Sequence, residues 1–117
     1  MRARPDLQVV MAGHITEPGY GGLSEHPGGF LGELLEPLEG RLDRGRLHAV
    51  GWLPLERLLA LFQVSAAHVY LSYPYTLSWS VLQAMACGAP VVGNADGPLA
   101  ELIEPERNGL LIEGCRP

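Results

Sequence analysis

The sequence contains no lysine, few cysteines and no long apolar run, and each absence removes a class of function. All eight basic residues are arginine, so no lysine can serve as a phosphate clamp, a Schiff base or a general base. The two cysteines, Cys87 and Cys115, suggest neither a disulfide framework nor a metal site. No apolar run approaches the roughly 20 residues that cross a bilayer, and no signal peptide is recognisable. We therefore expect a cytoplasmic protein without a transmembrane segment.

The charge balance is acidic, with a formal net charge of -5 at pH 7. Binding to a phosphate backbone requires a basic face, so we do not expect a nucleic acid as a partner. The chain has 117 residues, of which 47% are hydrophobic, which is enough for a globular domain with a core. We expect a single domain over residues 1–117.

Short apolar, β-prone runs alternate with segments of helical periodicity along the chain. We expect strands at 7–12, 46–52, 66–72, 90–94 and 110–112, and helices at 30–42, 54–62, 78–87 and 99–103. Pro37 should bend or interrupt the helix at 30–42. This alternation predicts an α/β fold with a Rossmann-like, doubly wound parallel sheet.

The chain is organised around residues 72–94, which we expect to form a turn, a helix and a strand after the preceding strand. Ser78 or Ser80 is a suitable N-cap for this helix, and Gly88 followed by Pro90 is a stop signal. We expect the helix to be buried against a sheet through an apolar stripe. The stripe consists of Trp79, Leu82, Met85 and Ala86.

A loop that joins the carboxyl end of a strand to the start of a helix is where open α/β sheets bind ligands. The free N–H groups and the positive end of the helix dipole favour an anion such as a phosphate. Most such loops bind nothing, however. From chemistry alone, a plain βαβ crossover without a ligand is the more frequent outcome.

Several motifs resemble those of a known family. Residues 73–80 read Y-P-Y-T-L-S-W-S, and A-M-A-C-G at 84–88 and P-V-V at 90–92 follow. This segment resembles the donor-site segment in the C-terminal half of GT-B retaining glycosyltransferases of group 1, or family 4, and in particular a branch with Y-P-F-x-L-S-W-S. Further matches are R-P-D-L at 4–7, V-G-W-L-P at 50–54, G-P-L-A-E-L-I at 97–103 and N-G-L-L at 108–111.

The resemblance implies one half of a GT-B fold, incomplete at both ends, that binds a nucleotide diphosphate sugar. The intact enzyme would move the sugar to an acceptor hydroxyl with retention and without a required metal or other cofactor. Its acceptor-binding N-terminal domain would lie in the same or another chain, and we expect this chain alone to transfer no sugar. Two alternatives are a non-catalytic nucleotide-sugar-binding module that needs a separate partner chain, and a degenerate domain with no ligand.

The resemblance also assigns binding roles to residues, but no catalytic residue within this chain. It places the donor diphosphate and sugar at the start of the central helix and the nucleobase after the second strand, with further loop contacts that could reach the ligand. The residues are Tyr75, Thr76, Leu77, Ser78 and Trp79 for the diphosphate and sugar, Gly51, Trp52 and Leu53 for the nucleobase, and Gly13, His14 and Tyr20 for the loops.

Gln83 stands where the family has a glutamate that hydrogen-bonds the ribose hydroxyls, so the resemblance implies ribose binding. The alternative is a capping box in which Gln83 is tied to the helix start at Ser80. Trp52 could equally be an ordinary packed aromatic residue. His14 and His26 could contact a ligand from the loop between residues 13 and 29, although we expect both to be solvated loop histidines.

Overall fold

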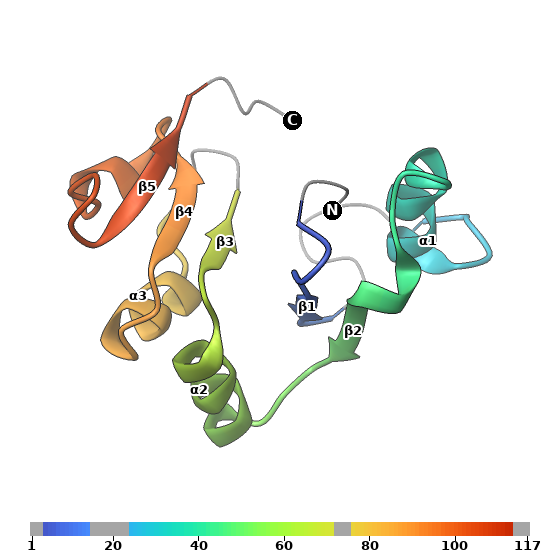
Figure 1. Ribbon diagram of the computed structural model, residues 1–117, viewed down its shortest axis with the longest axis horizontal. Coiled ribbons are helices and arrows are strands. Elements are labelled where there is room, and N and C mark those ends of the chain that lie inside the picture. The colour runs from blue at the N-terminus through green and yellow to red at the C-terminus, as the bar shows by residue number, and fades with distance from the viewer. Residues whose placement is uncertain (1–3, 15–23, 72–75, 114–117) are drawn as a thin grey trace. The chain divides into compact units, whose positions relative to one another are not determined.

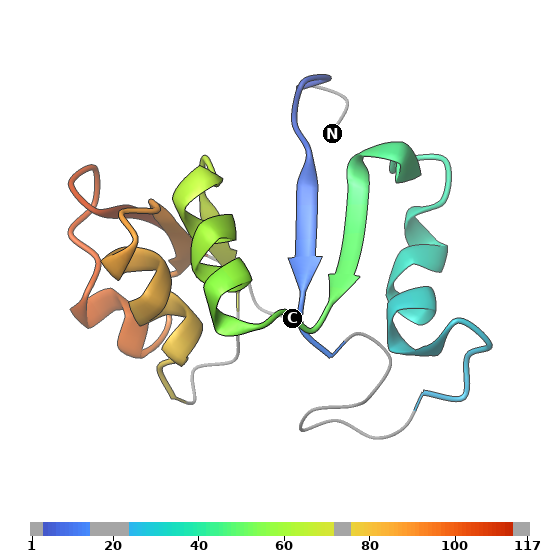
Figure 2. The ribbon, with the colours of Figure 1, turned by 90° about the horizontal axis from the view of Figure 1, so that it is seen from below.

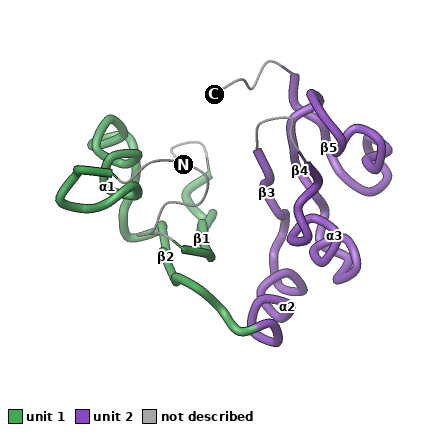
Figure 3. Tube along the Cα trace, turned by 180° about the vertical axis from the view of Figure 1, so that it is seen from behind, with its two compact units in different colours: residues 1–54 green, residues 55–117 purple. Residues whose placement is uncertain are grey.

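The computed structural model describes residues 4–14, 24–71 and 76–113, in which strands and helices alternate (Figure 1). The chain divides into two compact units, residues 1–54 and residues 55–117 (Figure 3). All the paired strands that the structure describes run parallel, which confirms the predicted α/β class. None of the described helices is long and apolar enough to cross a membrane.

The first unit contains a parallel pair of strands, β1 (Val9–Ala12) and β2 (Leu47–Gly51), which Figure 2 shows side by side. Val9 lies opposite Leu47, and the register shifts between Met11 and Ala12, so that Ala12 lies opposite Gly51. Before β1, the Arg4 guanidinium hydrogen-bonds the Asp6 carboxylate and lowers the pKa of Asp6. The R-P-D-L segment thus forms a local polar turn that leads into the strand.

The helix predicted at 30–42 is shorter in the structure. It consists of α1 (Gly29–Leu35) followed by a single 3-10 turn, η1 (Glu36–Leu38). Pro37 has no N–H to donate, and Gly40 has a φ of 73°, which ends helical geometry. A second 3-10 turn, η2 (Arg44–Arg46), precedes β2, with Asp43 as its N-cap.

The second unit contains a three-stranded parallel sheet in the order β3 (His68–Tyr70), β4 (Val91–Asn94) and β5 (Gly109–Ile112). The helix α2 (Leu55–Val64) precedes β3, and α3 (Trp79–Ala86) connects β3 to β4. The helix predicted at 99–103 is a 3-10 helix, η3 (Pro98–Glu101), between β4 and β5.

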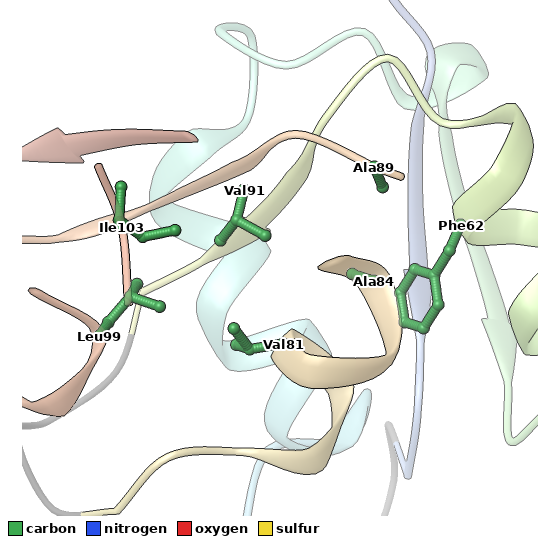
Figure 4. Close-up of a cluster of buried hydrophobic side chains, with 7 residues drawn as sticks. All are labelled: Phe62, Val81, Ala84, Ala89, Val91, Leu99 and Ile103. Atoms are coloured by element: carbon green, nitrogen blue, oxygen red, sulfur yellow. The ribbon is translucent and has the colours of Figure 1, made fainter. Parts of the chain in front are cut away.

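A cluster of buried apolar side chains holds the second unit together (Figure 4). Val81 and Ala84 of α3 are completely buried, whereas Trp79 is 79% exposed and Leu82 is 39% exposed. Of the predicted stripe, Met85 is partly buried and packs against this cluster, but the helix is buried mainly through a neighbouring face. The cluster comprises Phe62, Val81, Ala84, Ala89, Val91, Leu99 and Ile103.

Two glycines allow close approach within this unit. A Cβ on Gly93 would lie 2.0 Å from Leu99 Cδ2, so η3 packs directly on β4 at this point. A Cβ on Gly109 would lie 2.4 Å from the backbone oxygen of Val91 in the neighbouring strand. Real Cβ contacts are not this short, so side chains at these positions would force the elements apart.

Candidate functional site

The amino terminus of α3 presents polar backbone groups, and the first turn of the helix contains no acidic side chain. Ser78 is the N-cap, and its Oγ accepts a hydrogen bond from the Ser80 N–H at 3.2 Å. The carbonyl of Ser78 accepts the Val81 N–H at 3.1 Å, while the Trp79 N–H bonds to no residue that the structure describes. With no acidic residue in the first turn, the positive end of the helix dipole is free to attract an anion.

The residues around the start of this helix differ in burial, since Leu77 packs against the core while Thr76 and Trp79 are exposed. Leu77 is half-buried and packs against the hydrophobic core, which fixes where the helix begins. Thr76 is exposed, and its hydroxyl donates to the Leu77 carbonyl at 3.3 Å. The indole of Trp79 is 79% exposed, so a large aromatic surface lies beside the helix start. Tyr75 lies outside the described residues.

The structure does not contain the capping box proposed for Gln83. Because α3 begins at Trp79, Ser80 is its second residue, and the Ser80 N–H already bonds to Ser78 Oγ. Gln83 is half-buried, and its side chain makes no hydrogen bond with the residues described. Its side chain is not needed to start the helix, and its ribose role stays a prediction.

In the first unit, the structure brings a predicted loop contact, Gly13, together with a predicted nucleobase position, Gly51. The Gly13 N–H donates to the Gly51 carbonyl at 2.9 Å, immediately after β1 and at the end of β2. Their φ angles are 134° and 70°, in the region that favours glycine. Trp52 follows and is 65% exposed, which argues against the packed-aromatic alternative. Leu53 is half-buried, His14 is exposed, and Tyr20 lies outside the described residues.

His26 has a structural role, so the expectation of a solvated loop histidine was wrong. Its Nδ1 accepts the Gly28 N–H at 2.9 Å, just before α1. The ring lies against Gly32, where a Cβ would come within 2.5 Å of Nδ1, and Nε2 is 3.8 Å from the Glu36 carboxylate. This histidine therefore orders the start of α1.

Asn94 is a polar residue whose burial the sequence analysis did not anticipate. It is 5% exposed at the carboxyl end of β4, and its Nδ2 donates to the Asp96 carbonyl at 2.8 Å. This bond shapes the turn into η3, next to the strand ends where α/β folds bind ligands. The sequence signal that could have revealed this residue is its position, since Asn94 is a polar residue at the end of an apolar strand.

Neither metal-ligating side chains nor pockets among the described residues indicate a second ligand site. Within residues 4–14, 24–71 and 76–113, no three His, Cys, Asp or Glu side chains are grouped so that they could hold a metal ion. A pocket of about 510 Å³ lies between the end of α3 and the turn before β5. It is at the amino ends of β4 and β5, whereas Asn94 is at the carboxyl end of β4. None of the predicted binding residues lines it.

Comparison with known proteins identifies the family. A family model described as glycosyl transferases group 1 matches residues 2–117. The chain belongs to the group 1 glycosyltransferases. It is 30% identical over 122 residues to a D-inositol 3-phosphate glycosyltransferase of Mycolicibacterium vanbaalenii, and the match covers 97% of this chain but 25% of that protein. The chain thus spans about a quarter of the length of this curated relative.

A solved structure confirms the fold of this glycosyltransferase domain. The crystal structure of AviGT4, a glycosyltransferase involved in avilamycin A biosynthesis, matches with a TM-score of 0.59 at 23% identity. The match covers 91% of this chain and 29% of that chain. The predicted fold, an α/β domain like one half of a GT-B glycosyltransferase, is therefore confirmed.

Proposed function

We propose that this chain is the donor-binding part of a retaining glycosyltransferase that uses a nucleotide diphosphate sugar. The observation that carries the proposal is the amino terminus of α3, which Ser78 caps and whose first turn contains no acidic residue. Membership of the group 1 glycosyltransferases supports a nucleotide sugar as the ligand. The Y-P-Y-T-L-S-W-S segment favours the branch with the same pattern.

In this proposal the protein stabilises the diphosphate that departs when the sugar is transferred. The backbone N–H groups at the start of α3 and the helix dipole offset the negative charge that develops on the leaving group. This assistance needs neither a metal nor a lysine, consistent with a chain whose basic residues are all arginine. The exposed indole of Trp79 would cover the sugar beside the diphosphate.

The rest of the donor is assigned by resemblance. The nucleobase would meet the backbone at 51–53 and the ribose would meet Gln83, while Tyr75 and Thr76 would line the approach to the diphosphate. Because this chain spans a quarter of its curated relative, sugar transfer belongs in this proposal to a longer protein or to a complex. An acceptor-binding domain would then complete the cytoplasmic enzyme.

Two substitutions at Ser80 test the anion site. Ser80→Asp and Ser80→Asn place side chains of nearly equal size in the first turn of α3, but only the aspartate adds a negative charge. An acidic residue there stabilises the helix through the dipole yet repels a diphosphate. We expect Ser80→Asp to bind UDP, GDP or ADP at least about tenfold more weakly than Ser80→Asn, a difference of about 1.4 kcal/mol.

Isothermal titration calorimetry with each nucleoside diphosphate measures this difference. Thermal unfolding provides the control, because Ser80→Asp should be at least as stable as Ser80→Asn. Equal affinities for the two variants, or no binding of any nucleoside diphosphate by the unmodified chain, would overturn the proposal.

Gln83→Glu tests the ribose assignment on the same helix. A carboxylate has two acceptor oxygens for the two ribose hydroxyls, whereas the amide of Gln83 offers one. Charge-assisted hydrogen bonds are also stronger than neutral ones. We expect Gln83→Glu to tighten nucleoside diphosphate binding by roughly tenfold, about 1.4 kcal/mol. Unchanged affinity in the same calorimetric titration would remove Gln83 from the site.

A further inference from the structure

His68, the first residue of β3, is packed against aromatic rings at the edge of the hydrophobic core. The Phe62 ring of α2 meets its imidazole edge-on, with centroids 5.0 Å apart and an interplanar angle of 73°. The Tyr70 ring stacks on it at 6.4 Å and 28°. The Nε2 atom is buried and has no hydrogen-bond partner in the part of the chain that the structure describes.

This environment accommodates a neutral imidazole better than a charged one. A neutral ring can leave one nitrogen as a bare acceptor, but imidazolium carries an N–H at both nitrogens and a positive charge. At Nε2 that charged donor would be buried without an acceptor, which is costly. Desolvation therefore lowers the pKa of His68.

Among the residues that the structure describes, no charged side chain contributes to the pKa shift of His68, which has burial as its only cause. The helix α2 carries Glu56 and Arg57, which lie in its first turn, whereas Phe62 lies near its other end. The elements α3 and β4, which also pack on β3, contain no Asp, Glu, Lys, Arg or His. The remaining titratable groups of these neighbours are the Tyr70 phenol and the Cys87 thiol after α3.

We propose that His68 makes β3 sensitive to acid, and with it the proposed diphosphate site at the start of α3. The His68 ring packs on Phe62, and the backbone N–H of His68 donates to the Pro90 carbonyl at 2.8 Å, which holds the strand on β4. Protonation favours states in which the imidazole reaches water and β3 loosens from its packed position. The consequence for donor binding rests on the proposed function, since β3 leads toward residues 75–79.

The direction of the pH effect on stability follows from the difference in proton binding between the folded and unfolded states. A histidine whose pKa is lowered in the folded state binds fewer protons when folded than when unfolded. Its contribution to stability is complete above the ordinary value of 6.5 and is lost as the pH falls from there to the folded-state pKa. Over that window, one proton can raise the unfolding equilibrium constant by at most about tenfold per pH unit.

Urea unfolding followed by circular dichroism between pH 8 and pH 5 tests the proposal. The His68→Phe variant keeps an aromatic ring against Phe62 but cannot titrate. We expect the unfolding constant of the unmodified chain to rise below pH 6.5 relative to that of His68→Phe, by several-fold and up to about tenfold per pH unit. The control is His48→Gln, because His48 is exposed on β2 and its Nε2 pairs with Gln8. That variant should keep the pH dependence of the unmodified chain.

Parallel pH profiles for the unmodified chain and His68→Phe would overturn the proposal. If His68→Phe does not fold, His68→Gln removes the titration with a polar side chain and gives the same comparison. Nucleoside diphosphate titrations at pH 7.5 and 5.5 test the link to the proposed diphosphate site, and binding should weaken by a larger factor in the unmodified chain than in His68→Phe. An equal factor in the two would overturn that link. Absence of binding at both pH values would instead overturn the proposed function and leave the unfolding result standing.

Discussion

The two compact units differ in what holds them together. Every fully buried apolar side chain in the described residues belongs to residues 55–117, where Val81 and Val91 have no exposed surface at all. In residues 1–54, no residue that the structure describes is buried, and Val10 and Val50 in the two strands are 41% and 45% exposed. The second unit therefore has a hydrophobic core of its own, whereas the described residues of the first unit form none.

Polar contacts between nearby residues organise the first unit instead. Asp43 accepts hydrogen bonds from the Gly45 N–H and the Arg46 guanidinium, both at 3.0 Å. Ser24 donates to Glu33 at 2.7 Å. Exposed contacts of this kind contribute little stability each, and an isolated pair of strands is marginal in water. The start of α3 is therefore supported by a packed core, whereas the positions of Gly13 and Gly51 depend on weaker contacts.

The largest effect is expected where the second unit is most tightly packed. In Gly93→Ala, the new methyl group would collide with Leu99, and we expect a loss of about 3 kcal/mol in the free energy of unfolding. Gly45→Ala is the control in the first unit, because its Cβ would meet only Asp43 Oδ1, at 3.3 Å. Urea unfolding of the two variants measures the difference. Similar stabilities would show that the two units are packed alike.

A matched pair of valine substitutions compares the units directly. Val81→Ala removes two methyl groups from a completely buried position, and we expect it to cost about 2 kcal/mol of unfolding free energy. Val10→Ala removes the same groups from a strand residue that is 41% exposed, and we expect at most about 0.5 kcal/mol. Equal losses in chemical denaturation would contradict the conclusion that only the second unit has a core.

The smallest effect tests the polar contacts of the first unit. Asp43→Ala removes both the cap of η2 and the partner of Arg46, and we expect a loss of about 1 kcal/mol. Asp43→Asn keeps an acceptor for the Gly45 N–H and should lose about half as much. Raising the salt concentration should narrow the stability gap between the unmodified chain and Asp43→Asn, because screening weakens exposed ion pairs. A gap that salt does not change would mean that the Asp43 charge contributes nothing.

The sequence predicted the order of elements well because strands and helices here are separated by clear breaks. It could not predict which face of α3 is buried, because that helix is apolar on several faces and periodicity alone does not choose among them. In the structure the buried residues of α3 are Val81 and Ala84, whose small side chains allow the helix to pack in the core with Val91 and Leu99.

The site was predicted mainly from a local motif, and this limited what could be foreseen. Both Ser78 and Ser80 are good caps by residue type, and only the observed helix start assigns the cap to Ser78. The end of α1 at Leu35 and the 3-10 geometry of η1 and η3 depend on Pro37 and Pro98, whose effect on helix type is hard to predict locally. The hydrogen bond between Gly13 and Gly51 joins residues far apart in sequence, so no local pattern could reveal it.

The central claim is that the start of α3 binds the diphosphate of a nucleotide sugar. Titration of the ¹⁵N-labelled chain with a nucleoside diphosphate, followed by the NMR shifts of its backbone amides, tests this claim most directly. We predict that the amides of Trp79 and Ser80 shift most and saturate together, because their N–H groups lie at the positive end of the helix. Saturating shifts confined to the pocket between α3 and β5, around Arg107 and Asn108, or no saturating shifts at all, would contradict it.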